Sequence, residues 1–219
     1  MHHFIYANKA TTISSGSDKE NSKSGLVLTE QNFGQDEILE LKKTFYNLDF
    51  DYPTRVLVHF DLSSVQNEIS NLSGSRDEIV PNTDPTKGSK FYLRLWEAEG
   101  NKEASSDYGI TAHALSESWD EGRGKKGADP QIKDGASMLG ANVPIVASQS
   151  FSSSIPDIEM NVTDIVIPWL SGSDHVGSSP KGVENNGFIL RFTGSQETDS
   201  EMFSQLNFFS NNTNTIYSP

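Results

Sequence analysis

The side chains that could carry out catalysis in this chain do not form a known catalytic pattern. The five histidines lie far apart in the sequence, at His2, His3, His59, His113 and His175. The chain contains no Gly-x-Ser-x-Gly, no phosphate-binding glycine loop and no His-Glu-x-x-His, the patterns of hydrolases, nucleotide-binding enzymes and zinc proteases. His59 and His113 alternate with apolar residues as strand residues do, so we expect them to be structural. The sequence therefore predicts a protein that is not an enzyme.

The 30 Asp and Glu residues raise two further possibilities, a carboxylate pair for glycoside hydrolysis and an oxygen-ligand site for calcium. A glycosidase needs two carboxyl groups across a cleft, and spacing in a sequence does not identify such a pair. Asp49, Asp51 and Asp61 flank one predicted strand, but their spacing does not match a calcium-binding loop such as the EF-hand. We predict no cofactor and no metal ion, with structural calcium as the remaining alternative.

Aromatic side chains are better candidates for a binding site, because carbohydrate-binding proteins stack sugar rings on exposed aromatic residues. Phe91–Glu97 alternates, with Phe91, Leu93 and Leu95 on one face. Tyr92 and Trp96 share the other face with Arg94. This pair is the candidate carbohydrate-binding site, and packing in the core or an interface is the competing role.

Composition argues against several other classes of partner. Lys and Arg number only 17, which gives a net charge of −13, whereas binding to nucleic acid needs clustered cations. The chain has no cysteine, so disulfides and thiolate zinc sites are excluded. No apolar stretch approaches the ~20 residues that span a bilayer. The N-terminal residues also lack the pattern of a secretory signal. We therefore expect that the protein does not insert into a membrane and that it is assembled in the cytoplasm.

Periodicity predicts most of the secondary structure as strands. Alternation of apolar and polar residues indicates half-buried strands at Thr54–Leu62, Phe91–Glu97 and Tyr108–Leu115. A first strand is expected between Phe4 and Ile13, with a break near Asn8 and Lys9. The period of Asp36–Lys43 suits a helix as well as a strand.

Two short helices and several loops complete the prediction. Ser63–Ile69 is expected to be a helix with Ser as its N-cap, and Asn161 or Thr163 is expected to cap a helical segment that Pro168 shortens or kinks. Polar segments rich in glycine, proline or serine predict loops, at 14–25, 46–53, 71–89 and 122–150. Short strands, many turns and little helix together predict one elaborated all-β domain over residues 1–219, an antiparallel sandwich with long polar loops.

Five segments in order carry a family resemblance: Asn32–Leu41, Thr54–Ser64, Ser118–Gly122, Asn161–Leu170 and Asn186–Phe192. In that order they resemble the DNRLRE-type β-sandwich domain, which is related to a carbohydrate-binding module. The resemblance runs from roughly residue 4 to the end and favours a strand for Asp36–Lys43. It implies a jelly-roll-like sandwich whose core holds Phe60, Leu62, Trp119 and Trp169.

Domains of this family occur in secreted polysaccharide-binding proteins and in virion structural proteins of large tailed phages. Because the sequence has no recognisable secretory signal and has long polar loops, we expect a virion structural protein of the neck, tail or capsid surface, present in multiple copies. Its partners would be other virion proteins and copies of itself. The alternative is a carbohydrate-binding module, or an adhesin for a host-surface glycan, that uses Tyr92 and Trp96.

The C-terminal residues suggest an interface. A strand is predicted at Phe203–Ser210, because its phenylalanines offer too much apolar surface to leave in water. Resembling domains carry one more strand after a segment like Thr215–Pro219, where this sequence stops. We therefore expect another chain, or a further part of this one, to add a strand at an open edge here. The residues expected to make this contact are Phe208, Phe209, Ile216 and Tyr217.

Overall fold

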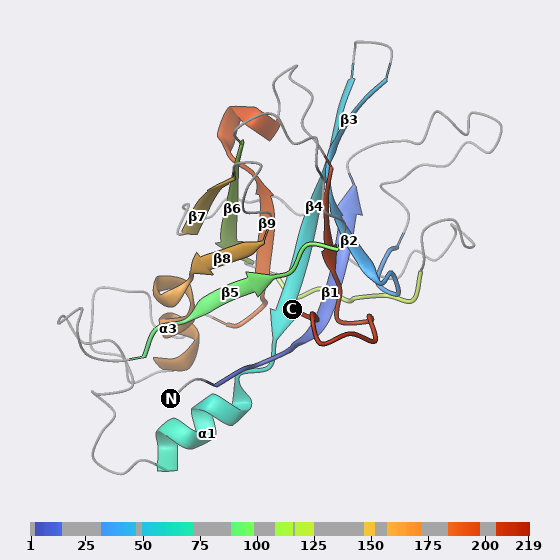
Figure 1. Cartoon of the computed structure of the whole chain (residues 1–219). Coiled ribbons are helices and arrows are strands. Elements are labelled where there is room, and N and C mark those ends of the chain that lie inside the picture. Colours follow the sequence, from blue (N-terminus) through green and yellow to red (C-terminus); the bar gives the residue numbers. More distant parts are fainter. Residues whose placement is uncertain are drawn as a thin grey trace.

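The protein is an all-β structure built from antiparallel strands, as the sequence predicts (Figure 1). The computed structural model describes residues 3–14, 32–46, 50–71, 89–98, 108–115, 117–124, 147–151, 157–171, 184–197 and 205–219. These ranges hold ten strands, the helices α1 (Ser63–Asn71) and α3 (Thr163–Ser171), and the 3-10 turn η3 (Gly194–Glu197). None of the helices in these ranges is long and apolar enough to cross a membrane.

The larger sheet has the strand order β1-β4-β9-β6-β7, and every neighbouring pair is antiparallel. Its strands are β1 (Ala7–Ser14), β4 (Phe50–Phe60), β9 (Phe188–Phe192), β6 (Tyr108–Ala114) and β7 (Ala147–Phe151). A sixth strand, β3 (Lys43–Tyr46), pairs with the start of β4. The pairing of β1 with β4 shifts register between Ala7 and Lys9, so the expected break near Asn8 is a bulge in one strand.

The smaller sheet consists of two antiparallel ladders that meet side by side. One ladder pairs β2 (Ile38–Leu41) with β10 (Leu206–Phe209), and the other pairs β5 (Tyr92–Leu95) with β8 (Ile158–Asn161). A bridge between Glu97 and Phe208 joins them, which places the four strands in the order β2-β10-β5-β8. In Figure 1, β5 and β8 cross in front of the strands of the larger sheet.

A single main core lies between the two sheets. The larger sheet contributes buried apolar side chains from alternate positions, such as Val56, Val58 and Leu190, and the smaller sheet contributes Leu93 and Phe208 among others. The predicted alternation of β5 is confirmed, since Leu93 and Leu95 are buried while Tyr92 and Arg94 are exposed. Helix α3 adds three side chains to the same core: Ile165, Val166 and Trp169.

The centre of β4 is buried on both faces, which differs from the half-buried strand that its period of two predicts. Val56 and Val58 face the main core, and Leu57, on the other face, is also fully buried. A second apolar cluster on the outer face of the larger sheet covers Leu57, and its other members are Ile13, Leu115, Trp119 and Ile189. The alternating side chains in the centre of β4 therefore face two different apolar clusters, rather than one core and solvent.

Two of the predicted loops contain strands. Phe50–Pro53, predicted as loop, belongs to β4 and pairs with Lys43–Tyr46 of β3. Pro53 is tolerated there because the neighbouring Thr54 amide donates to Lys42 O, so the nitrogen of Pro53 faces away from β3. The predicted loop 122–150 overlaps β7 at 147–150, where polar serines alternate with Ala147 and Gln149. Residues 15–25, 72–88 and 125–146 of the predicted loops lie outside the described residues.

The local caps are set by residues just before each helix. Asp61 Oδ1 accepts the Ser63 amide at 2.9 Å, so Asp61 rather than the predicted Ser holds the start of α1. Asn161 Oδ1 accepts the Thr163 amide at 3.1 Å, as one of the two predicted caps of α3. Pro168 lies inside α3 without ending it before Ser171. The segment Asp36–Lys43 contains β2, which confirms the strand that the resemblance favours.

Candidate binding surface

Five residues from three segments form what we call the aromatic surface: Tyr92, Trp96, Phe209, Ile216 and Tyr217. The pleat of β5 turns Tyr92 outward and places Trp96 on the same side just after the strand. The Phe209 amide donates to Trp96 O at 3.1 Å, which aligns the end of β10 with the residues after β5. The structure thus brings the predicted carbohydrate site and most of the predicted C-terminal interface together.

The rings of this surface are packed against one another. Trp96 and Tyr217 meet edge to face, with centroids 5.7 Å apart and planes at 64°. Phe209 and Tyr217 are stacked, with centroids 5.8 Å apart and planes at 21°. Both arrangements are favourable for aromatic pairs, and they hold Tyr217 in place.

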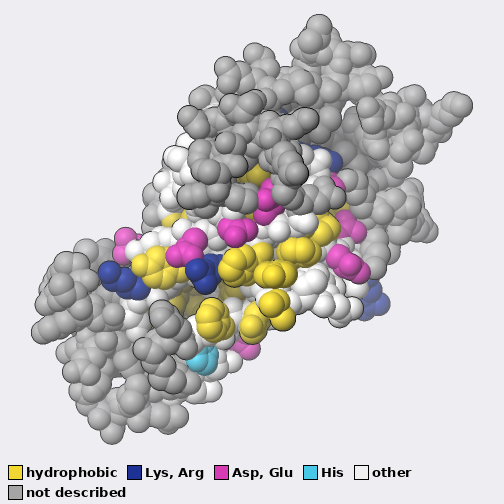
Figure 2. Space-filling view, viewed as in Figure 1, with side chains coloured by type: hydrophobic (Ala, Val, Ile, Leu, Met, Phe, Trp, Pro, Cys, Tyr) yellow, Lys and Arg dark blue, Asp and Glu magenta, His cyan; other side chains and the backbone are white. Residues whose placement is uncertain are grey.

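A large part of the surface nevertheless faces solvent. Ile216 is 81% exposed, Tyr92 52% and Tyr217 44%. Figure 2 shows the corresponding band of apolar side chains across one face, over β5 and the C-terminal segment. Phe4 and Tyr6 are exposed as well, and the Ala7 amide next to them donates to Pro219 O at 2.7 Å. Contiguous apolar surface of this kind is typical of interaction sites rather than of bare monomer surface.

Charged groups border the aromatic surface on β5. The guanidinium carbon of Arg94 lies 5.5 Å from the centroid of the Trp96 ring. The same guanidinium forms an ion pair with Glu159 on β8, with Arg94 Nε 2.8 Å from Glu159 Oε2. Both side chains of the pair are about half exposed, so the pair contributes little to stability and leaves Arg94 beside the face of Trp96.

The expected open edge at the end of the chain is wrong, and so is the interface role of Phe208. Strand β10 has neighbours on both sides, β2 on one and the residues after β5 on the other, where the Ala98 amide donates to Asn207 O at 2.7 Å. Phe208 faces inward between these strands and is fully buried in the main core. Only Phe209, Ile216 and Tyr217 of the predicted interface reach the outer surface.

The segment that carries Ile216 and Tyr217 is held at several points. Asn212 Nδ2 donates to Gly34 O at 2.7 Å, and Asn211 Nδ2 donates to Glu121 Oε1 at 3.0 Å. Ser210 is fully buried, and its hydroxyl contacts Asp36 O. The segment is therefore a fixed part of the fold that presents Ile216 outward.

A buried junction joins two of the segments on which the family resemblance rests, Asn32–Leu41 and Ser118–Gly122, and includes Gly124 just after the second. Asn32 Nδ2 donates to Glu121 O at 2.8 Å, while Asn32 Oδ1 accepts the Gly34 amide at 3.1 Å and the Gly124 amide at 2.6 Å. Gly122 has φ +78°, and a side chain there would collide with Asn32. We call these contacts the asparagine junction. The Asn-Phe-Gly and Trp-Asp-Glu-Gly segments thus have structural roles.

The four residues assigned to the core differ in burial. Leu62, Trp119 and Trp169 are buried, and Phe60 is partly buried against the main core. Trp119 Nε1 donates to Asn186 O at 2.8 Å, which satisfies its only polar group. Trp169 packs edge to face on Phe188 with centroids 4.9 Å apart.

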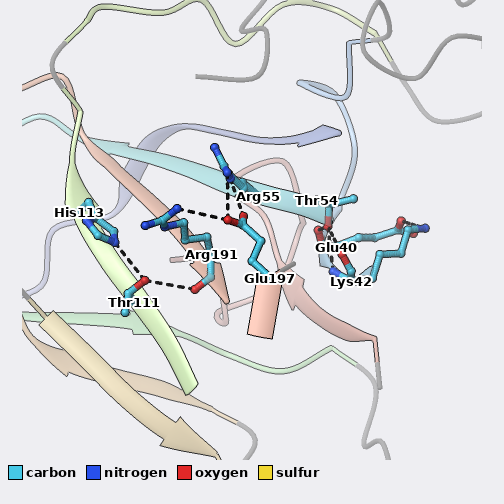
Figure 3. Close-up of polar contacts among 8 residues, drawn as sticks. All are labelled: Glu40, Lys42, Thr54, Arg55, Thr111, His113, Arg191 and Glu197. Carbon is cyan, nitrogen blue, oxygen red and sulfur yellow. Dashed lines mark hydrogen bonds and ion pairs between the residues drawn. The ribbon is translucent and has the colours of Figure 1, made fainter. Parts of the chain in front are cut away.

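Sequence reasoning missed a buried cluster of charges on the outer face of the larger sheet, shown in Figure 3. Arg55 donates two hydrogen bonds to the Glu197 carboxylate, at 2.6 and 3.0 Å, and Arg191 Nη1 lies 3.2 Å from the same carboxylate. The Glu197 side chain is only 5% exposed. We call these residues the arginine–glutamate cluster. Isolated arginines in apolar strands were the signal, but Glu197 lies 142 residues from Arg55, so no local pattern connects them.

The two groups with shifted pKa values also serve structure. Partial burial lowers the pKa of His59, as does the nearby charge of Lys9, while the hydrogen bond to Asn185 O and the charge of Asp61 oppose the shift. His59 Nδ1 lies 2.6 Å from Asn8 Oδ1 and Nε2 lies 3.2 Å from Asn185 O. Hydrogen bonds from Ser63 lower the pKa of Asp61, in keeping with its capping role.

No group of three or more His, Asp or Glu side chains in the described ranges is placed to hold a metal ion. Of the three aspartates considered for calcium, Asp49 lies outside these ranges and Asp61 caps α1. The contacts of Asp61 are thus explained without a cation.

Comparison of the chain with protein-family models finds no match, and no curated protein matches it either.

Proposed function

We propose that this chain is a non-enzymatic structural protein of a tailed-phage virion, which docks on other virion proteins through the aromatic surface. The observation that carries the proposal is the exposure of Ile216 and Tyr217 on a firmly anchored segment beside Trp96. The ordered segments that resemble virion-associated β-sandwich domains support the choice of class. A place at the neck, tail or capsid surface, in several copies, follows from the same resemblance.

A protein partner suits this surface better than a sugar does. Arg94 lies beside the face of Trp96, and Tyr217 contacts the same ring edge to face, so little of Trp96 is open for stacking. Ile216 offers an aliphatic side chain without a hydrogen-bonding group. Aromatic and apolar anchors bordered by arginine are typical of the centres of protein interfaces.

The jelly-roll form belongs to the proposal as well. The smaller sheet runs β2-β10-β5-β8, so strands distant in sequence are neighbours, and the chain passes repeatedly between the two sheets. Long connections of this kind are the mark of Greek-key and jelly-roll sandwiches.

The test of the proposal is the protein content of purified particles. Quantitative mass spectrometry of phage particles from the source genome should find the chain in multiple copies. An Ile216→Asp/Tyr217→Ser variant supplied in place of the wild type should fold normally but be depleted from particles, since a charge would be buried at the interface. A matched Ser118→Asp change on an exposed loop should leave incorporation unchanged. Absence of the wild-type protein from particles would refute the proposal.

A glycan-binding role is the second candidate, favoured by Tyr92. Tyr92 is 52% exposed and shares its side of β5 with Arg94, whose ion pair with Glu159 offers polar groups for sugar hydroxyls. A glycan array should then show binding that Tyr92→Ala removes and that Ile216→Asp retains. Blank arrays with the folded wild type would exclude this role.

A further inference from the structure

The outer strands of the two sheets differ in how their edges are closed. On β1, the Ala10 amide points away from β4 and is accepted by Glu121 Oε1 at 2.8 Å. On β2, Glu40 donates its amide to the Thr12 hydroxyl at 2.9 Å, and its carbonyl accepts the Thr54 hydroxyl at 2.7 Å. Side chains therefore occupy backbone groups that another strand would need.

Strand β8 is closed in the same way by its neighbour β7. Gln149 Oε1 accepts the Glu159 amide at 2.8 Å, and Gln149 Nε2 donates to Asp157 O at 2.9 Å. These bonds also fix β7 to the smaller sheet. Strand β7 itself lies at the end of the larger sheet opposite β1 and, among the described strands, pairs only with β6.

The register shows which groups of β7 face outward. Gly109 O accepts the Thr193 amide, so odd-numbered residues of β6 face β9 and even-numbered ones face β7. Ile110 pairs with Gln149, which means that Gln149 faces β6 and its neighbours Ser148 and Ser150 face away. Both serines are exposed. Within the described part of the chain, their outward amides donate no hydrogen bond and their outward carbonyls accept none.

Strand β7 also lacks the features that protect an edge. Its sequence, Ala-Ser-Gln-Ser-Phe, has no charge and no proline, and its pairing with β6 is regular over all five residues. An edge of this kind is a template for a further strand.

We infer that β7 is a self-association edge, on which β7 of a second copy pairs antiparallel about a two-fold axis through Gln149. Because the axis passes through Gln149, Ser148 of one copy falls opposite Ser150 of the other. Each strand would then use both outward serine amides and both carbonyls. Two-fold pairing is the commonest form of self-association. A strand that pairs with its own copy brings any charge close to the same charge of the other copy, and β7 carries none, which favours a second copy as the partner.

This edge is separate from the aromatic surface, since β7 belongs to the larger sheet and β5 and β10 to the smaller one. The two proposals can therefore fail independently. The edge is short, so the dimer should be of the weak class that forms with rising concentration. Two chains of net charge −13 repel each other, and added salt should strengthen the dimer by screening.

Sedimentation of the full chain over a range of concentrations tests the inference. The mass should rise from 24.1 kDa toward twice that value, and more readily at higher salt. Ser150→Pro removes an outward amide without touching the pairing with β6, and should weaken dimerisation roughly tenfold or more. Ser150→Thr keeps the amide and should dimerise like the wild type.

A second variant guards against misfolding of the proline variant. Ser148→Lys/Ser150→Lys keeps the backbone but sets like charges opposite each other in the dimer, and should abolish it although it lowers the net negative charge. A wild type that stays monomeric at every concentration and salt would overturn the inference. So would a dimer that both edge variants leave intact, or one that is lost instead in Ile216→Asp, which would assign association to the aromatic surface.

Discussion

The aromatic surface and the arginine–glutamate cluster lie on the outer faces of different sheets and invert the usual relation of polarity to exposure. Ile216 and Tyr217 are apolar and open to solvent, whereas Glu197 and Arg55 are charged and largely buried. Burial of the charges is tolerable because both guanidinium groups share one carboxylate. The cluster makes its contacts within the chain, whereas for the aromatic surface we propose contacts between chains.

The largest loss of stability should come from a substitution in the arginine–glutamate cluster. Glu197→Gln removes the carboxylate that Arg55 and Arg191 share, and should lower the free energy of unfolding by about 3–5 kcal/mol. Glu159→Gln, which breaks the exposed pair with Arg94, should cost at most about 1 kcal/mol. Urea unfolding of both variants measures the difference, and equal costs would contradict the distinction.

A somewhat smaller loss is expected at the asparagine junction, which anchors the segment beneath the aromatic surface. Asn32→Ala leaves the Gly34 and Gly124 amides without their acceptor and should cost roughly 2–4 kcal/mol, at ~1–3 kcal/mol for a buried unsatisfied group. Asn214→Ala, on an exposed residue, should change stability by less than about 0.5 kcal/mol. Thermal unfolding compares the two variants. An Asn32→Ala variant as stable as the wild type would show that the asparagine junction does not stabilise the fold.

Acidification should weaken the fold moderately through His59. Its pKa in the folded protein lies below the ordinary value of 6.5, so the unfolded chain takes up a proton first as pH falls. Stability should therefore decline as pH drops through about 6.5 and until the folded pKa is passed. His59→Gln should flatten this decline in unfolding measurements between pH 7.5 and pH 5. An unchanged pH profile in the variant would assign the acid sensitivity to other groups.

The smallest effect on stability should come from the aromatic surface itself. Ile216→Ser removes an apolar side chain that is 81% exposed, so the free energy of unfolding should change by less than about 0.5 kcal/mol. Phe208→Ser, one strand away but fully buried, should be strongly destabilising because it leaves a cavity and a buried hydroxyl. A large loss of stability in Ile216→Ser would show that the residue supports the fold rather than an interface.

Local signals in the sequence predicted much of the secondary structure. The alternation of Tyr92 to Leu95 and the cap at Asn161 appear in the structure, and the expected break near Asn8 is a bulge within the continuous strand β1. Such features depend on neighbours a few residues apart, which share a face or a turn. The sequence missed the start of β4 and all of β7, since Phe50–Pro53 contains a proline and β7 is polar.

By itself, the sequence determined the all-β class, the alternation of β5 and the outward side shared by Tyr92 and Trp96. Only the tertiary structure decided that Tyr217 packs on Trp96, that Glu197 meets Arg55 and that β10 has neighbours on both sides. The physical reason is separation along the chain. Periodicity and capping act over one turn or one pleat, whereas these contacts join residues up to 171 positions apart, from Ile38 to Phe209, and depend on how the sheets pack.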